Sequence, residues 1–289
     1  MGLELNGLRR RSARTAALGG AALLALSGCS SDGMPGSQWA RIGLQAPASD
    51  RAPHMGQLWI GAWVACAVIG VLVAGLIFYA MYKFRRSENN QIPRQVRYHV
   101  PLEVLYTIVP FLIVIVLFFF TVKAENRVLA KEAAPQHTIH VVGQKWSWTF
   151  NYLEKNNTAI GETAHEIGTI EKIPDLYLPY GESVRFNITS ADVNHSFWVP
   201  AFYFKVDAIP GHPNSFDLTP TKMGTFDGKC AELCGTYHAA MLFNVHVVSV
   251  EEYNAKVKEL VAAGQTGELN GPANPTALPV AAAAKEEKK

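Results

Sequence analysis

The sequence predicts a hairpin of two transmembrane helices followed by an all-β antiparallel sandwich outside the membrane. Two long uncharged apolar runs, 58–82 and 104–122, indicate the hairpin. Beyond residue 137, apolar and polar residues alternate, which is typical of strands with one buried face. A short helical pattern at 251–262 follows the last of these strands.

The first 28 residues predict a bacterial export signal of the lipoprotein type. Several arginines precede an apolar stretch of Ala, Leu and Gly, as export signals require. The stretch ends in Leu26-Ser27-Gly28-Cys29, which resembles a lipobox. Cleavage there would leave Cys29 as a lipid-modified N-terminus, with 29–57 as an extracytoplasmic segment. The alternative is an uncleaved signal with an incidental cysteine.

Both apolar runs are long enough to cross a bilayer. As helices they would extend roughly 37 and 28 Å, against a hydrocarbon core of about 30 Å. In the loop between them, 83–103, the only acid ahead of Glu103 at its end is Glu88. The loop carries five cations, which are Lys83, Arg85, Arg86, Arg94 and Arg97. The positive-inside rule therefore places this loop in the cytoplasm and the chain after residue 122 outside it. We predict the plasma membrane of a bacterium, and we expect Cys66, inside the first run, to pack as an apolar residue.

The outer domain, 123–250, is predicted to be a sandwich of strands. Alternating residues occur at 146–152, 184–189 and 241–247. An opposite phase at Ile139 and Val141 predicts a bulge at 142–144 that re-aims one continuous strand. We expect turns at Pro179-Tyr180-Gly181, Pro210-Gly211 and Asp227-Gly228. The Ala, Pro, Gly and Lys-rich tail within 251–289 is predicted to be disordered after its short helix.

The charge balance and the cysteines limit the possible functions. A net charge of +2 gives no concentrated basic patch, so we expect no nucleic-acid partner. Four cysteines in three separate contexts are too few for a disulfide framework.

One segment combines thiols, an imidazole and a thioether. Cys230, Cys234, His238 and Met241 lie within twelve consecutive residues, and His195 precedes them. These ligand types together select copper. A blue-copper site needs only one thiolate, whereas a second one suits two sulfurs that bridge two copper ions, with one histidine for each ion. Met241 and a backbone carbonyl between the cysteines would complete the two ligand shells.

Simpler interpretations exist for each of these residues. Outside the cell Cys230 and Cys234 would be able to form a disulfide, a lone histidine is usually surface, and a methionine at a strand start is usually core. The order of the residues, with Met241 in phase with its strand's buried face, favours the metal. The other histidines lack ligand spacing, and we interpret them as unliganded.

Four segments, LEVLYTIVP, GQKWSW, VNHSFWVPAFYFKVDAIPG and CAELCGTYHAAM, resemble the cytochrome c oxidase subunit II family over roughly 55–250. The resemblance implies a cupredoxin-like sandwich with a binuclear copper centre, CuA. The residues that would bind copper are His195, Cys230, Cys234, His238, Met241 and the carbonyl of Glu232. It also implies a magnesium ion at the interface with subunit I, bound by the Glu232 carboxylate and Asp207.

The resemblance further implies three residues for transport. Trp146 would receive electrons from a c-type cytochrome, although for Trp146 or Trp148 a buried place in the sandwich is the alternative. Asp192 would belong to an acidic patch that docks the donor, or be a solvated surface acid. Glu103 would lie at the cytoplasmic mouth of a proton path into subunit I, or be solvated there.

The implied function is subunit II of an oxidase that passes electrons from CuA to the haems of subunit I, where oxygen is reduced to water and protons are translocated. The expected partners are subunits I and III and a c-type cytochrome. The lipoprotein signal resembles that of actinobacterial subunit II proteins, and this resemblance implies that the donor is a haem c subunit of a cytochrome bc complex in a supercomplex. The alternative is a membrane-tethered blue-copper carrier or copper-delivery protein. Subunit II of quinol oxidases would lack the copper ligands, and a β-domain held by a disulfide would leave the histidines and Met241 unexplained.

Overall fold

The computed structural model describes residues 38–85 and 95–270, which fall into two compact units, 1–46 and 47–289. The export signal, Cys29, part of the loop between the helices and the end of the tail lie outside the described residues. The described part of the first unit is a turn, in which the Gly43 amide donates to the Gln38 carbonyl over 2.9 Å.

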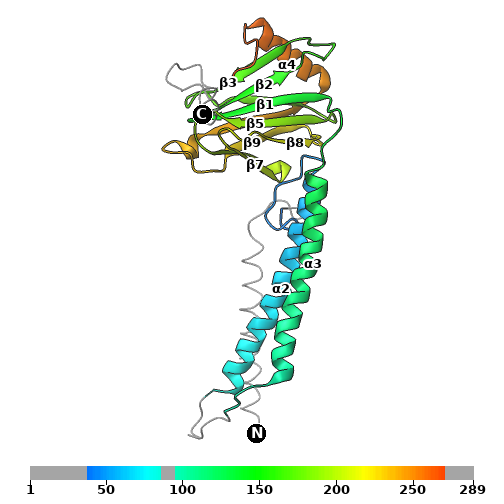
Figure 1. Ribbon diagram of the computed structural model, residues 1–289, viewed down its shortest axis with the longest axis vertical. Helices are drawn as coiled ribbons and strands as arrows, with labels where there is room; N and C mark the ends of the chain where they lie inside the picture. The colour runs from blue at the N-terminus through cyan, green and yellow to red at the C-terminus, as the bar shows by residue number, and fades with distance from the viewer. Residues whose placement is uncertain (1–37, 86–94, 271–289) are drawn as a thin grey trace, which may run out of the picture. The chain divides into compact units, whose positions relative to one another are not determined.

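Two long helices, α2 (Ala52–Lys83) and α3 (Val100–Val128), lie side by side in the second unit (Figure 1). Both are long and apolar enough to cross a membrane, and their apolar side chains are mostly exposed. Each continues at its outer end beyond the predicted apolar run. Arg51 joins these ends, because its guanidinium donates to the carbonyls of Arg127 at 2.7 Å and Ala130 at 3.2 Å. A C-terminal cation of this kind satisfies carbonyls that a helix leaves unpaired.

The β domain consists of two five-stranded sheets, ordered β3-β2-β1-β5-β8 and β4-β10-β9-β6-β7. The strands of the first sheet are β1 His137–Gln144, β2 Ser147–Leu153, β3 Thr163–Ile167, β5 Val184–Ser190 and β8 Asn214–Leu218. Those of the second are β4 Asp175–Pro179, β6 His195–Val199, β7 Phe204–Ala208, β9 Gly224–Cys230 and β10 Leu242–Val248. Short 3-10 turns occupy Pro200–Phe202 and His238–Ala240, and α4 (Val250–Ala262) follows β10.

The sandwich is confirmed, but its sheets are mixed rather than purely antiparallel. β1 pairs with β5 in parallel, and β10 pairs with β4 in parallel. Parallel partners need a crossover connection, and here the chain crosses to the other sheet between β3 and β5. Alternation of residues predicts a buried face but carries no information on strand direction, which is why the sequence did not reveal this.

The core between the sheets is aromatic. Phe243 of β10 stacks on Phe197 of β6, with ring centroids 4.8 Å apart, and Trp148 of β2 meets Phe243 edge-on at 5.5 Å. Gly228 lies opposite Phe243 in the register, and a Cβ there would fall 2.1 Å from the ring. The predicted turn at Asp227-Gly228 is therefore wrong: the glycine lies within β9 and makes room for the ring.

The predicted bulge at 142–144 is also wrong. β1 and β2 are two strands of one hairpin, paired from Ile139 with Tyr152 to Gln144 with Ser147. The change of phase arises because the chain reverses at Lys145-Trp146, which leaves Trp146 in the turn.

The chain after α4 departs from the expected disorder in its first residues. The amide of His165 donates to the Gln265 carbonyl at 2.9 Å, and the Leu269 amide donates to the Asn151 side chain at 2.8 Å. The segment lies against β2, so Asn151 is buried where we expected solvent. The prediction for 271–289 lies outside the described residues.

Candidate metal centre

The loop between β9 and β10 gathers the predicted copper ligands. Cys230 is the last residue of β9 and Met241 immediately precedes β10. The Cys230 amide donates to the Met241 carbonyl at 3.0 Å, so the hairpin closes across the base of the loop. A single 3-10 turn, beginning at His238, returns the chain. The loop thereby folds back over its own cysteines.

The two cysteines lie side by side with different neighbours. Their Sγ atoms are 3.8 Å apart, well beyond the roughly 2 Å of a disulfide bond, and both are free thiols. The Cys230 Sγ is 3.9 Å from the His195 Nδ1 and 3.2 Å from the Glu232 carbonyl. The Cys234 Sγ is 3.5 Å from the His238 Nδ1 and 3.7 Å from the Met241 Sδ. Each sulfur therefore has one imidazole and one further donor beside it.

His195 is held in position by two neighbours on other elements. Its Nε2 hydrogen-bonds to the Asp192 Oδ1 over 2.8 Å, so the Nδ1 faces Cys230. The ring packs on Gly143 of β1, where a Cβ would lie 3.1 Å from the imidazole. His195 is fully buried. A carboxylate on the outer nitrogen fixes the tautomer and the orientation of a metal-binding histidine.

The two thiols have pKa values shifted in opposite directions. Burial alone would raise the pKa of Cys230, but hydrogen bonds from His195 and from the backbone at Glu232 and Ser196 outweigh burial and lower the pKa to about 6. Burial and the charge of Cys230 raise the pKa of Cys234 to about 12. For His195 burial acts in the opposite direction and lowers the pKa. Its bonds to Asp192 and Cys230 outweigh burial, so the net shift of the His195 pKa is upward. Without a cation the site therefore favours one thiolate, at Cys230, rather than two.

The donor set fits copper in its chemistry. Two thiols, two imidazoles, a thioether and a carbonyl converge, and His195, Cys230 and Cys234 have ligand atoms within 4.8 Å of one another. Soft sulfur with imidazole is the ligand combination that proteins use for copper. Two thiolates that share a buried site need the positive charge of metal ions to be stable together.

Comparisons with known proteins identify the family of the chain. The family models for the transmembrane and periplasmic domains of cytochrome c oxidase subunit II match residues 37–124 and 137–248. The chain belongs to the cytochrome c oxidase subunit II family. It is 43% identical to the probable cytochrome c oxidase subunit 2 of Streptomyces avermitilis, over 89% of each chain. It is 34% identical to cytochrome c oxidase subunit 2 of Corynebacterium diphtheriae, over 86% of each.

Among solved structures, the periplasmic domain of subunit II of cytochrome oxidase from Bradyrhizobium japonicum matches 47% of the chain and 98% of its own, with 30% identity and a TM-score of 0.40. The family membership confirms the predicted fold class and the predicted function as a cytochrome c oxidase subunit, and copper and electron transport follow from it.

Trp146 and Trp148 have different environments. Trp148 is fully buried in the sandwich core. Trp146 is part-exposed, and its indole N–H donates to the Cys234 carbonyl at 3.2 Å. Tyr237 meets Trp146 edge-on at 5.0 Å, and Gly235 leaves room for the indole. Trp146 therefore joins the surface of the domain to the backbone of a predicted ligand.

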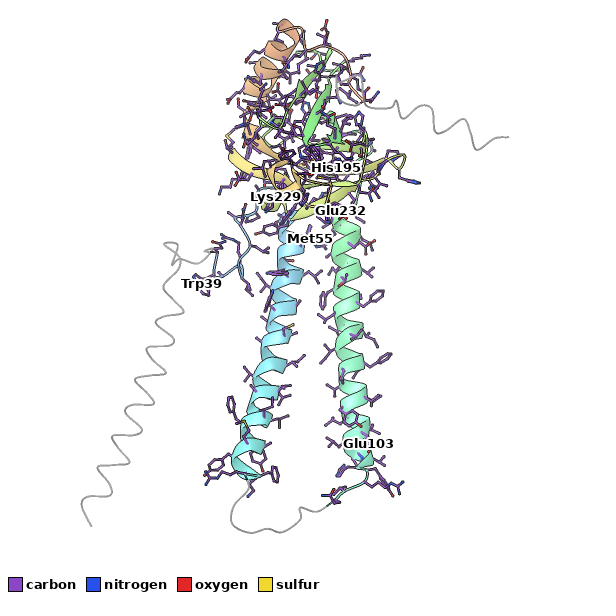
Figure 2. The ribbon with its side chains drawn as sticks, turned by 90° about the vertical axis from the view of Figure 1, so that its left-hand side faces the viewer. Trp39, Met55, Glu103, His195, Lys229 and Glu232 are labelled. Carbon is purple, nitrogen blue, oxygen red and sulfur yellow. The ribbon has the colours of Figure 1, made fainter. Side chains whose placement is uncertain are left out.

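The predicted acids lie in three different settings. Asp192 accepts from the Lys145 and Val193 amides as well as from His195, and these bonds outweigh burial and lower its pKa. Asp207 accepts from the Ser196 hydroxyl at 2.7 Å and pairs with Lys205 at 3.3 Å. Glu232 is exposed (Figure 2).

Glu103 is located far from the metal centre, at the other end of α3 (Figure 2). It occupies the first turn of α3, and its Oε1 accepts from the His99 amide at 3.0 Å. The His99 Nδ1 accepts from the Leu102 amide at 3.3 Å. Together the two side chains cap the helix reciprocally, a structural role that the sequence reading missed.

Sequence reasoning also missed three residues around the metal centre. They are Gly143, Gly235 and Tyr237, which shape the space for His195 and Trp146. Their only signal in the sequence was their position inside the segments GQKWSW and CAELCGTYHAAM, which resemble the family. Spacing alone does not reveal which residues these three contact.

Proposed function

We propose that this chain binds two copper ions as a CuA centre and is the subunit through which electrons enter the oxidase. The observation that carries the proposal is the arrangement of Cys230 and Cys234, whose sulfurs are adjacent and each have one histidine beside them. Two copper ions bound there would supply one-electron redox chemistry. The residues that would bind them are His195, Cys230, Glu232, Cys234, His238 and Met241.

The protein's own contribution is to fix these donors before metal arrives. Asp192 orients His195, the β9–β10 pairing holds Cys230 against Met241, and Gly143 lets His195 pack closely. A rigid, mostly buried ligand cage changes little when its charge changes, which keeps the reorganisation energy of electron transfer small. This is the property that an electron-transfer site needs.

We assign Trp146 as the residue that receives electrons from a c-type cytochrome. Its support is the part-exposed ring and the hydrogen bond to the Cys234 backbone. Asp192, whose side chain is 25% exposed, stays a prediction for the docking patch, although its carboxylate already has three donors. A haem c subunit of a cytochrome bc complex is the proposed donor.

A magnesium ion is proposed at Glu232 and Asp207. The Ser196 hydroxyl donates to Asp207, and the Ser196 carbonyl accepts from the amide of Ala231, the residue before Glu232. Figure 2 shows Glu232 at the margin of the β domain nearest the two helices, the side on which a membrane subunit would meet it. Carboxylate oxygens suit magnesium.

The remaining proposals concern the membrane. We propose that α2 and α3 anchor the chain in the bacterial plasma membrane beside subunits I and III, with the β domain outside the cytoplasm and Cys29 acylated. Glu103 would then lie at the cytoplasmic mouth of a proton path into subunit I. Exchange of Glu103 for Gln in the assembled oxidase should lower proton pumping per electron, whereas a purely capping residue would leave pumping unchanged.

Reduction of the copper-loaded full-length chain by a reduced c-type cytochrome tests the proposed function. We expect Trp146→Ala to slow this reduction at least tenfold without changing the copper content. Trp39→Ala, at a tryptophan that is 55% exposed, is the matched control and should leave the rate unchanged. A copper-loaded chain that takes no electrons from any c-type cytochrome would contradict the assignment.

A further inference from the structure

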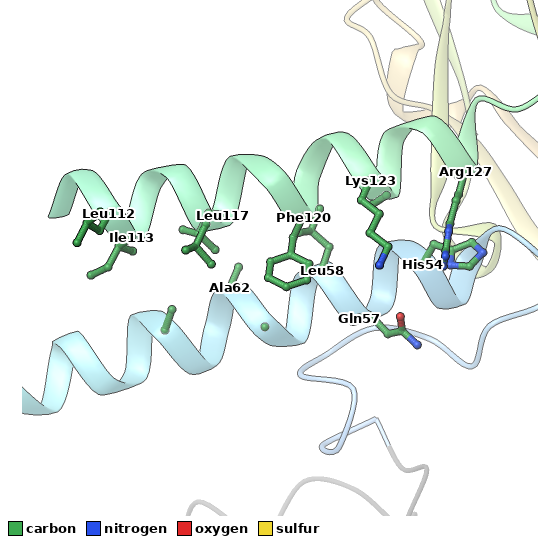
Figure 3. A pocket seen from close by; sticks show the side chains of 14 residues that line it. His54, Gln57, Leu58, Ala62, Leu112, Ile113, Leu117, Phe120, Lys123 and Arg127 are labelled. Carbon is green, nitrogen blue, oxygen red and sulfur yellow. The ribbon is translucent and has the colours of Figure 1, made fainter. Parts of the chain in front are cut away.

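A cavity of about 680 Å³ lies between α2 and α3 near their outer ends (Figure 3). Its volume is in the range of roughly 300–1,000 Å³ in which proteins bind small molecules. Residues from both helices line it, and Gly61, Val116 and Phe120 among them are exposed. The cavity is therefore a groove that opens toward the surroundings of the helices.

The groove follows from a mismatch in side-chain size. α2 contributes Gly61, Ala62 and Ala65, and a Cβ at Gly61 would meet nothing within 4 Å. α3 contributes larger apolar side chains, such as Leu117 and Phe120, which do not reach across to fill the space. The wall along most of the groove is apolar, as an acyl chain requires.

The outer end of the groove is cationic. Lys123 and Arg127 extend from α3 toward α2 beside His54 (Figure 3). Their spacing of four residues places them on one face of the helix. No aspartate or glutamate lines the groove, and within 38–85 and 95–270 no carboxylate pairs with either cation. Two positive charges at the end of an apolar groove favour a ligand that combines an anionic group with an apolar tail.

We propose that this groove binds one anionic phospholipid of the outer leaflet. Lys123 follows directly on the apolar run 104–122, so it lies where lipid phosphates are found if the proposed membrane placement holds. The phosphate would contact Lys123 and Arg127, and an acyl chain would lie along Ala62, Ala65 and Leu117. The lipid would complete the packing of α2 on α3 beneath the metal-binding domain.

The full-length chain in detergent, titrated with phosphatidylglycerol or phosphatidylcholine and observed by native mass spectrometry, tests this proposal. We expect one phosphatidylglycerol to bind more tightly than phosphatidylcholine. Lys123→Gln and Arg127→Gln should each weaken phosphatidylglycerol binding about fivefold, and together about thirtyfold, with little effect on phosphatidylcholine. Ala62→Phe should fill the groove and weaken binding of both lipids.

Two variants are matched controls. Lys222→Gln removes a cation from the β domain, and Val71→Phe adds the same ring at a residue that is 75% exposed and outside the groove. Both should bind phosphatidylglycerol as the wild type does. Copper binding, measured on every variant, reports folding independently and separates a failure here from a failure of the proposed function.

Equal binding of the two lipids, or phosphatidylglycerol binding that survives the double charge variant, would overturn the proposal. A photoreactive residue at position 65 in the assembled oxidase gives the last check. Cross-links to phospholipid support the proposal, whereas cross-links to another subunit would show that protein fills the groove.

Discussion

Two buried histidines, His137 at the start of β1 and His195 of β6 packed near the other end of β1, have contrasting partners. His137, the first residue of β1, has a carboxylate on each ring nitrogen: Glu154 at 2.9 Å and Glu182 at 2.6 Å. His195 packs on Gly143 near the other end of β1 and has one carboxylate, Asp192, while its second nitrogen faces a thiol. Both rings are buried and charged neighbours surround both, yet only His195 has a nitrogen directed at further ligands. The partner of the second nitrogen is therefore what separates His137, with both nitrogens on carboxylates, from the proposed ligand His195.

The largest expected effect is at the metal end. Cys230→Ser should abolish the binuclear copper centre, a greater loss than the roughly 10–100-fold that removal of an outer hydrogen-bond partner costs. The fold should persist, because Cys230 is at the end of β9 and its backbone pairing is unchanged. Copper titration with circular dichroism measures both. Cys66→Ser, at an exposed thiol in α2, is the matched control and should bind copper normally.

Substitution of His137 should lower stability and leave copper binding unchanged, the reverse of Cys230→Ser. His137→Leu leaves Glu154 and Glu182 without the imidazole that both contact, and removal of one partner from a buried charged contact costs about 3–5 kcal/mol. Tyr253 of α4 also donates to Glu154, at 2.8 Å, so α4 should loosen as well. Denaturant unfolding measures the loss, and copper stoichiometry should stay at the wild-type value. Loss of copper without loss of stability would contradict the comparison.

An intermediate effect is expected at Asp192, which acts through His195. Asp192→Asn should lower copper affinity about 10–100-fold, because the amide no longer fixes the imidazole tautomer as a carboxylate does. The copper spectrum should shift, which a purely structural role would not cause. Competition with a copper chelator gives the affinity, and an unchanged affinity and spectrum would remove Asp192 from the site.

The smallest effect is a pH dependence that belongs to His137. Burial alone would lower the pKa of His137, but its bonds to Glu154 and Glu182 outweigh burial and raise it. The folded chain therefore retains a proton that the unfolded chain loses near pH 6.5. The stabilisation is fully present below that pH and is lost as pH rises through the folded pKa. The free energies of unfolding of the wild type and of His137→Leu should converge as the pH rises from about 6 to about 9. A constant difference between them over this range would contradict the prediction.

The sequence predicted the grouping of the proposed ligands better than the scaffold around them. Sulfur and imidazole in fixed spacing predict a metal site, and the structure brings together the five side chains that this spacing singled out, which are His195, Cys230, Cys234, His238 and Met241. Apolar length likewise predicted both helices, because a bilayer requires it.

What the sequence missed depends on contacts between distant segments. Gly228 suggested a turn, but its reason is the Phe243 ring on the next strand. The change of phase near Gly143 was a hairpin, which pairing rather than periodicity reveals. Glu154 hydrogen-bonds to His137, seventeen residues before it in the sequence, and to Tyr253, ninety-nine residues after it. Separations of this length leave no local pattern from which the contacts could be predicted. His195 and Asp192 are the exception, because they lie only three residues apart and their pairing is local.

The most direct measurement is the copper content and electron paramagnetic resonance spectrum of the oxidised, copper-loaded full-length chain. The account predicts two copper ions per chain that share one unpaired electron, so the hyperfine pattern should be that of two equivalent nuclei. A single copper with the pattern of one nucleus would contradict it and would favour a membrane-tethered blue-copper carrier. A copper-free chain with a Cys230–Cys234 disulfide would contradict both.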